Sequence, residues 1–324
     1  MCICATLYGQ VVSGDKSKIP VIFDTDADNE LDDQHALAYL LFSQDKFDIR
    51  GITINSTKYQ GKGSPVDQHY EEAVRVLKLC GYEAIPVKIG AELGFDQIEV
   101  DKTEFDGYQA VDFIHQIAKD QGDLVVIAVG KLTNLALALK KYPGLENRMR
   151  VVWLGSNYPQ PGEYNLKNDP PALNYILRSN VPFEIVTVRY GQNSGASNVR
   201  VTLEDIIINM KNVGPRVAPV AGRHGGLFSN FGDYSISLFK NIHLEGDPPS
   251  RALYDVVAIA ILKDPGFGEK RLIQALIYES GRWRERPDRD REITIWENFN
   301  PTMILHDFFQ AMRNSTSPNV ETND

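Results

Sequence analysis

The chain has 324 residues, of which 43% are hydrophobic and 24% charged, and it carries a formal net charge of -9. A globular protein of this length can bury a sizeable core, and the acidic balance argues against a nucleic-acid-binding surface, which is usually basic. No apolar run approaches the roughly 20 residues needed to span a bilayer, so a small neutral or cationic substrate, or a metal ion, suits the chain better.

The two ends of the sequence are expected to lie outside the fold. Residues 1–10 are apolar and resemble the last part of a secretory signal peptide, although the basic segment that begins such a signal is missing. Export and a cytoplasmic location therefore both stay open. We expect residues 1–17 to be an N-terminal segment, residues 18–313 to form a single domain, and the polar residues 314–324 to be a disordered tail. The three cysteines predict neither a disulfide framework nor a zinc site.

The most informative segment is an acidic stretch at the end of the first predicted strand. Six carboxylates lie within residues 24–33, between an apolar strand at 20–25 and a helical pattern at 31–43. Carboxylates this close repel one another unless a cation lies among them, and hard oxygen ligands favour Ca²⁺ or Mg²⁺ over zinc. Open α/β sheets place their sites at the carboxyl ends of parallel strands. The stretch therefore predicts a metal-centred active site.

Three other interpretations explain the acidic stretch less well. An acid-rich helix N-terminus accounts for two or three of the carboxylates but not for six. An EF-hand loop needs glycine at its sixth position and glutamate at its twelfth, where this sequence has Asn29 and His35. A phosphoryl-transfer aspartate of the haloacid-dehalogenase kind also follows a strand, but the second acidic pair which that fold needs does not stand out here.

Strand and helix patterns alternate through the first half of the chain, which is typical of βαβ units. Strands are expected at residues 20–25, 49–54, 85–89, 123–129, 150–155 and 183–188. Helices are expected at residues 31–43, 67–80, 106–120, 132–141 and 170–179. The segment 124–129 is apolar throughout, which suits a parallel strand that is covered on both faces of its sheet.

Two further segments place chemical groups at strand ends. Residues 127–136 predict a strand, a tight turn at Gly130 and an immediate helix; the upstream glycine of a P-loop is missing, but the carbonyl at the strand end could bind a hard metal ion. Glu163 and Asn165 lie two apart in a loop and could hold vicinal hydroxyls. Taken alone, an ordinary turn or polar loop explains each segment more simply.

The second half of the chain is less regular. Helices are expected at residues 202–211, 226–241, 251–262 and 301–313, and strands at 271–278 and 292–296. Asp255 lies in an otherwise apolar helical pattern, where an acid near a helix start is favoured by the dipole. A buried and unpaired acid is costly, however, and a metal ion would satisfy it.

Two loops of the second half carry further ionisable side chains. His224 lies in the glycine-rich segment 222–226 and is the histidine that we select as a functional candidate. Residues 282–291 alternate in sign, and because their acids largely cancel the basic charge, we predict a solvated hairpin or loop rather than a basic patch.

Four of these segments, in this order, resemble the motifs of the inosine–uridine-preferring nucleoside hydrolase family. The resemblance spans residues 18–265; each motif is weak alone, but four in the same order are a strong sign. The matching residues are Asp24, Asp26, Asp32 and Asp33; residues 129–134; residues 163–165 with Asp169 and Pro170; and Asp255 with Asp264 and Pro265.

The resemblance implies a nucleoside hydrolase fold, in which an open, mostly parallel Rossmann-like sheet carries helices on both faces and Ca²⁺ lies at the strand ends. The implied Ca²⁺ ligands are Asp26, Asp33, Asp255 and the carbonyl of Val129. The implied substrate-binding residues are Asp32, Glu163 and Asn165, which would hold ribose hydroxyls, together with Asn55 and Asn157. Asp26 would also be the general base toward a water held by Ca²⁺, while the carboxylates stabilise an oxocarbenium-like sugar.

The sequence departs from the family's pattern in two places that bear on substrate choice. The acidic loop is two residues longer than the usual spacing, which adds Asp28 and Glu30 near the mouth of the site. Tyr254 stands where purine-active members carry a histidine, and a tyrosine is a poorer acid because its pKa is near 10. His224 and Tyr254 are therefore both candidates for activating the leaving group.

The sequence thus predicts a calcium-dependent hydrolase that cleaves the N-glycosidic bond of a ribonucleoside or related ribosyl compound, giving ribose and free base. The alternatives are a hydrolase of another glycoside on the same scaffold, and a non-catalytic, calcium-dependent sugar-binding protein. The expected partner is a small nucleoside or ribosyl substrate, with no nucleic acid and no membrane, and the resemblance implies a homodimer or homotetramer.

Overall fold

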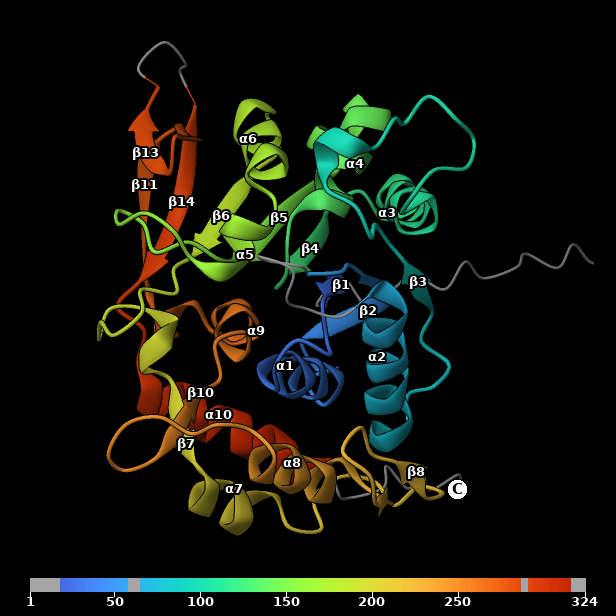
Figure 1. Ribbon diagram of the computed structural model, residues 1–324, viewed down its shortest axis with the longest axis vertical. Coiled ribbons are helices and arrows are strands. Elements are labelled where there is room, and N and C mark those ends of the chain that lie inside the picture. Colours follow the sequence, from blue (N-terminus) through green and yellow to red (C-terminus); the bar gives the residue numbers. More distant parts are fainter. Residues whose placement is uncertain (1–17, 58–64, 287–290, 316–324) are drawn as a thin grey trace, which may run out of the picture.

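A computed structural model describes residues 18–57, 65–286 and 291–315 of the chain. Helices lie above and below a central sheet in Figure 1. The predicted N-terminal segment 1–17 lies outside the described residues. Of the tail predicted at 314–324, Asn314 ends the last helix and Ser315 follows it, and the rest also lies outside the described residues.

The described part of the chain forms a sheet with the strand order β11-β14-β6-β5-β4-β1-β2-β3. All neighbouring strands are parallel except β11 and β14. The strands are β1 (Ile19–Thr25), β2 (Phe47–Ile54), β3 (Val87–Ile89), β4 (Leu124–Ala128), β5 (Met149–Leu154), β6 (Phe183–Val186), β11 (Glu269–Gln274) and β14 (Glu292–Glu297). The predicted open, mostly parallel sheet is confirmed, and its order reverses between β1 and β4, which is where such sheets bind ligands.

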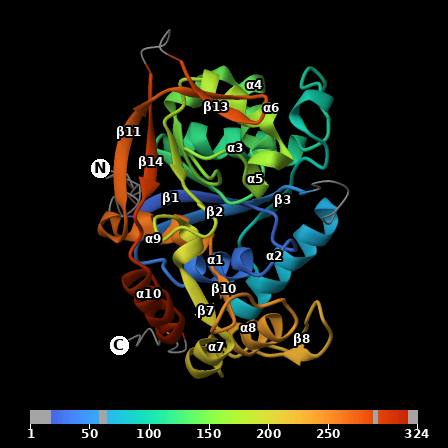
Figure 2. The same ribbon diagram turned by 60° about the vertical axis from the view of Figure 1, so that its left-hand side comes forward.

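Two layers of helices cover the sheet, as Figure 2 shows. One layer contains α3 (Tyr108–Gln121), α4 (Thr133–Lys141) and α6 (Pro170–Arg178). The other contains α1 (Asp32–Leu41), α2 (Val66–Cys80), α9 (Val256–Lys263) and α10 (Pro301–Asn314). Because side chains alternate along a strand, Val21 and Phe23 join the core on the α1 side and Ile22 joins the core on the α4 side.

All ten residues of α1 are buried, because α2, α9 and α10 pack around it beneath the sheet. Such a helix is apolar on all sides rather than amphipathic. Its first turn nevertheless contains Asp32 and Asp33, so two acids of the sequence motif are carried directly into the interior at the carboxyl end of β1.

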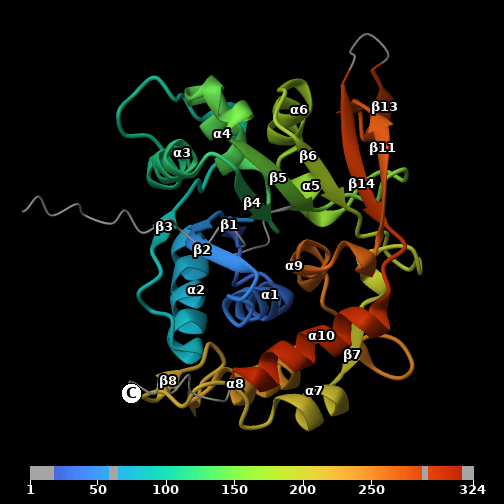
Figure 3. The same cartoon turned by 180° about the vertical axis from the view of Figure 1, so that it is seen from behind.

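The remaining elements extend this framework. In Figure 3, α7 (Leu203–Met210) and α8 (Phe231–Lys240) lie beyond α10, on the side away from the sheet. Three short antiparallel pairs are β7 (Arg200–Thr202) with β10 (Ser250–Ala252), β8 (Val220–Ala221) with β9 (Leu227–Phe228), and β12 (Leu276–Glu279) with β13 (Arg282–Glu285). The short helices are α5 (Tyr164–Asn168) and the 3-10 turns Phe95–Gln97, Pro143–Asn147, Ala196–Asn198 and Pro265–Phe267.

The structure corrects three predicted elements of the second half. The helix expected at 226–241 begins only at Phe231, because residues 227–228 pair as β9 and Asn230 caps the helix. The helix expected at 251–262 is a strand, β10, followed by a separate helix that begins at Val256. The strand expected at 271–278 is split at Ala275 into β11 and β12, which pair with different partners.

Other predictions of this region hold. The β12–β13 hairpin agrees with the solvated hairpin or loop predicted for residues 282–291, of which 287–290 lie outside the described residues. Within the described residues, no helix has the length and apolarity needed to cross a bilayer.

Candidate active site

A pocket of about 400 Å³ opens at the carboxyl ends of β1, β4 and β5. Its lining residues are Asp26, Asn29, Glu30, Asp32, Asp33, Val129, Leu154, Glu163, Tyr164, Asn165, Val188, Tyr190, Glu245, Arg251, Tyr254 and Asp255. A larger hollow of about 750 Å³ lies at the far ends of α1 and α10. That hollow is at the amino edge of the sheet, where open α/β sheets do not place their sites.

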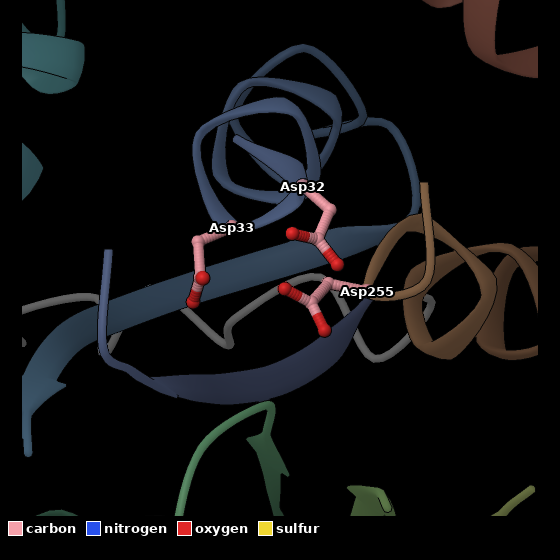
Figure 4. Close-up of side chains that lie close together, drawn as sticks. All are labelled: Asp32, Asp33 and Asp255. Carbon is pink, nitrogen blue, oxygen red and sulfur yellow. The ribbon is translucent and has the colours of Figure 1, made fainter. Parts of the chain in front are cut away.

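Three aspartates meet on the floor of the pocket. Asp32 and Asp33 begin α1, and Asp255 directly precedes α9, so two helices that are distant in sequence point their first residues at the same place (Figure 4). One carboxylate oxygen from each lies within 4.8 Å of the others. The residues are only 6%, 3% and 3% exposed.

The electrostatics of these aspartates are unfavourable without a cation. Burial, and then the charges of neighbouring acids, raise the pKa of Asp32, Asp33 and Asp255 well above the usual range. Thr25 relieves Asp33 only in part, by donating its hydroxyl to Oδ1 at 2.5 Å. Three converging and buried carboxylates form a hard-oxygen donor set, which fits a Ca²⁺ or Mg²⁺ ion.

Asp26 lies beside this cluster and accepts a hydrogen bond from the hydroxyl of Thr57. Burial raises the pKa of Asp26 to about 7, and the charge of Asp32 adds to the shift. The chain approaches Asp26 closely at Gly130, where an added Cβ would lie 2.7 Å from Asp26 Oδ1. The glycine of the 127–136 turn is therefore required by the carboxylate next to it.

Asp24 is a structural hub that the sequence motif contained but did not explain. It is fully buried and accepts hydrogen bonds from Thr53 at 2.6 Å, Asn55 at 2.6 Å and Asn134 at 2.8 Å. These three donors come from β2, the residue after β2, and α4. Asn55, a predicted substrate-binding residue, therefore contacts Asp24 and is not among the residues that line the pocket.

Glu163 and Asn165 are brought together as predicted, and the backbone holds both rigidly. The Glu163 carboxylate accepts from the backbone N–H groups of Ser156, Asn165 and Leu166, each at 2.9 Å, and its φ is a strained +137°. Asn165 Nδ2 donates to the carbonyls of Val129 at 2.8 Å and Leu154 at 3.1 Å. Both side chains line the pocket, where their oxygens can accept hydrogen bonds from a ligand.

Three tyrosines, Tyr164, Tyr190 and Tyr254, line the pocket, and only Tyr254 was predicted from the sequence. Burial, with the charge of Asp32, raises the pKa of Tyr254 to about 12. Tyr190 meets Tyr254 edge to face at 5.9 Å, and Tyr164 donates to Asn29 at 3.1 Å. Tyr190 lies in the loop after β6, at the edge of the sheet where sites form, and that position could have identified it from the sequence.

Two other predicted residues are not among those that line the pocket. His224 is exposed in the turn between β8 and β9, and partial burial with the nearby Arg223 lowers its pKa. The turn docks on the acidic loop through Arg223, whose guanidinium donates to the Glu30 carbonyl at 3.0 Å and lies 3.4 Å from Asp28. Asn157 accepts from the Tyr190 N–H at 3.2 Å and thus supports the pocket wall.

A family model described as inosine-uridine preferring nucleoside hydrolase matches residues 21–305, which is most of the chain. The chain belongs to this family. The pocket lies in the matched region, and the family resemblance that the four motifs indicated is confirmed.

Individual relatives of the family are distant. The pyrimidine-specific ribonucleoside hydrolase RihB of Escherichia coli O17:K52:H18 (strain UMN026 / ExPEC) is 27% identical over 159 residues, which are 47% of this chain and 45% of the relative. The chain thus spans about half the length of the curated relatives it matches.

Solved structures agree with the fold. A plant nucleoside hydrolase, PpNRh1, superposes with a TM-score of 0.72 at 17% identity over 91% of this chain and 99% of that one. A purine-preferring ribonucleoside hydrolase from Gardnerella vaginalis gives a TM-score of 0.69 at 18% identity over 91% and 98%. The predicted nucleoside hydrolase fold is therefore confirmed.

Proposed function

We propose that this protein hydrolyses the N-glycosidic bond of a ribonucleoside or a related ribosyl compound, in a reaction that depends on Ca²⁺. The observation that carries the proposal is the convergence of Asp32, Asp33 and Asp255 on the pocket floor, beside Asp26. Family membership supports the same reaction class. The names of the relatives include both pyrimidine-specific and purine-preferring enzymes, so base choice has to come from the pocket of this chain.

Oxygen donors on the pocket floor and beside it support the identity of the metal. Asp26, Asp33, Asp255 and the Val129 carbonyl would hold Ca²⁺, which prefers several oxygen ligands of mixed type. The chemistry that Ca²⁺ supplies when bound is positive charge, which orients a water and two vicinal hydroxyls and makes that water more acidic.

The residues of the chain supply the remaining steps. Asp26 lines the pocket beside the floor aspartates and is the carboxylate that would take a proton from the attacking water. Asp32, Glu163 and Asn165 would hold the ribose hydroxyls, since all three line the pocket. As the bond to the base breaks, the sugar gains positive charge, which the surrounding carboxylates stabilise.

Release of free ribose from a panel of purine and pyrimidine nucleosides, with and without a Ca²⁺ chelator, tests the proposal. Chelator-sensitive release is expected from at least one nucleoside. Asp26→Asn should lower kcat by about 10²–10⁴-fold, as the loss of a general base does. Asp48→Asn is the matched control, because Asp48 is a partly exposed acid that pairs with Arg50 on the surface of β2.

Absence of release from every nucleoside, with folded and Ca²⁺-loaded protein, would contradict the proposal and favour a sugar-binding protein. The homodimer or homotetramer implied by the resemblance remains a prediction, which light scattering of the same preparation checks.

A further inference from the structure

Arg251 is the only cationic side chain among the described residues that line the pocket. The other ionisable lining residues, besides the three tyrosines, are all acids: Asp26, Glu30, Asp32, Asp33, Glu163, Glu245 and Asp255. Arg251 lies in β10, four residues before Asp255, so the short strand that leads into α9 carries the guanidinium to the same pocket as the floor aspartate.

The guanidinium lies between the floor and the mouth of the pocket. It forms an ion pair with Glu30 of the acidic loop, and its other terminal nitrogen is 3.8 Å from Glu245, an exposed residue at the rim. On the inner side, its positive charge interacts electrostatically with the carboxylate of Asp32. A ribose on the floor would place its base toward the mouth of the pocket, within reach of this guanidinium.

The donors of Arg251 are not all used. Its side chain is 13% exposed, and its buried Nε–H has no hydrogen-bond partner within the described residues. The ion pair with Glu30 uses one terminal nitrogen of the guanidinium, and the other lies beyond hydrogen-bond distance from Glu245, so its N–H groups can donate to a ligand oxygen.

The described residues that line the pocket include no histidine that could protonate the departing base. The histidine predicted for this role, His224, is exposed and lies outside the lining. A leaving base can alternatively depart as an anion if a fixed positive charge stabilises it, and an arginine stays charged throughout the working pH range.

We propose that Arg251 is a catalytic residue that binds a carbonyl oxygen of the departing base and stabilises the negative charge which that base gains, while Glu30 fixes the orientation of the guanidinium. This inference rests on the proposed function and deepens it. The C1′–N bond breaks with its electron pair on the base, and a water oxygen bonds to C1′. The water loses its proton to Asp26, and the base anion takes a proton from solvent after departure.

The experiment compares two leaving groups. When uridine or inosine is cleaved, negative charge on the departing base is delocalised onto its carbonyl oxygens. The p-nitrophenolate released from p-nitrophenyl β-D-ribofuranoside is a stable anion and leaves without stabilisation by the protein. Arg251→Met should lower kcat/KM for uridine and inosine by about 100-fold or more, as the loss of one oxyanion donor does, and should change the nitrophenyl riboside rate little. Arg251→Lys, which keeps the charge without the planar fork, should give an intermediate loss with the same selectivity.

Controls and opposing outcomes are distinct. Arg150→Met removes a comparable ion pair with Glu184, on β5 and β6 away from the pocket, and should alter neither rate. An equal loss on both substrates would mean that Arg251 only neutralises the acids, and no loss on either would mean that it is idle; both outcomes overturn the inference alone. If the unmodified protein cleaves neither substrate with Ca²⁺ present, the proposed function itself fails and this inference falls with it.

Discussion

At the scale of single residues, the hydrogen-bond partners of a buried acid indicate whether its role is structural or in ligand binding. Asp24 accepts hydrogen bonds from three side chains and does not line the pocket. Asp32, Asp33 and Asp255 instead direct their carboxylates at one another on the pocket floor. A carboxylate surrounded by donors is a structural anchor, and carboxylates that face one another require a cation.

Replacing Asp24 by alanine should destabilise the protein strongly. The change leaves buried donors of Thr53, Asn55 and Asn134 without an acceptor, and each unsatisfied donor costs about 1–3 kcal/mol. We expect a loss of about 3 kcal/mol or more in the free energy of unfolding, measured by urea denaturation. Asp48→Ala, at a partly exposed surface acid, should cost no more than about 0.5 kcal/mol. Equal costs for the two variants would refute the role of Asp24 as an anchor.

Gly130 tests how closely the site is packed. A Cβ at this position would lie 2.5 Å from Asn55 Oδ1 and 2.7 Å from Asp26 Oδ1, so in Gly130→Ala these side chains or the turn itself have to shift. A misplacement of a reacting group by about 1 Å can lower the rate about 100-fold, even when the group itself is unchanged. Ribose release should fall accordingly. Gly144→Ala, where an added Cβ meets nothing within 4 Å, should leave the rate unchanged.

At the scale of elements, Asp169 connects Phe95 and the helices α4 and α6, which lie on the same face of the sheet. It caps α6 through the Ala172 N–H at 3.1 Å, accepts the Phe95 N–H at 2.8 Å, and accepts the hydroxyl of Thr133 in α4 at 2.5 Å. An aspartate at a helix start is ordinary, but this one also fixes the position of α4, whose first turn follows Gly130.

Asp169→Ala should therefore cost more than the loss of a helix cap. We expect about 2–4 kcal/mol in the free energy of unfolding, because two buried donors lose their acceptor in addition to the cap. Asn300→Ala is the comparison: Asn300 caps only α10, through the Met303 N–H at 3.1 Å, and its loss should cost about 1 kcal/mol. Thermal or urea unfolding distinguishes the two, and similar costs would show that Asp169 is a cap and nothing more.

Elements set by local periodicity could be predicted from the sequence, and elements set by distant partners could not. Strand β4 and helix α4 follow from an apolar run and a glycine turn. Residues 251–262 carry a helical apolar pattern, yet the first of them form β10 because they pair with β7, about 50 residues earlier in the chain. Strand β12 likewise departs from the sheet to pair with β13.

The same distinction applies to the site. Adjacent acids in a loop after a strand are visible in a linear pattern, which is why Asp32 and Asp33 of the pocket floor were predicted. Tyr190, Arg251 and Glu245 come from three separate loops or short strands and meet only when β7, β10 and the sheet are assembled. His224 was selected for its glycine-rich neighbours, but those glycines form a β-turn between β8 and β9.

At the scale of the whole molecule, the fold concentrates acids in one place and holds them there. The helices α1 and α9 direct their amino ends at the pocket, where the dipoles partly offset the negative charge. The remaining negative charge lies on buried aspartates, and the packed helices and strands around them hold these side chains close together. The stability of the whole protein should therefore depend on whether these carboxylates carry protons, carry charge, or bind a cation.

Calcium removal should destabilise the protein more as pH rises. Burial raises the pKa of Asp26 from 3.8 to about 7 and moves Asp32, Asp33 and Asp255 in the same direction, so between about pH 4 and pH 7 the folded state without metal binds more protons than the unfolded state. Its stability is then greatest at the acid end of this window and falls as pH increases. A cation bound by the ionised carboxylates reverses the trend, because it stabilises only the folded state.

The difference in Tm with and without Ca²⁺ should accordingly be small near pH 5 and large near pH 8. Differential scanning calorimetry of one preparation, with Ca²⁺ or with chelator, measures it. Asp255→Asn removes one charge and one ligand, so this variant should show a flatter Tm profile in chelator and a smaller response to Ca²⁺. A chelator profile that rises with pH, or a Ca²⁺ response unchanged in the variant, would mean that the floor aspartates are not where the cation binds.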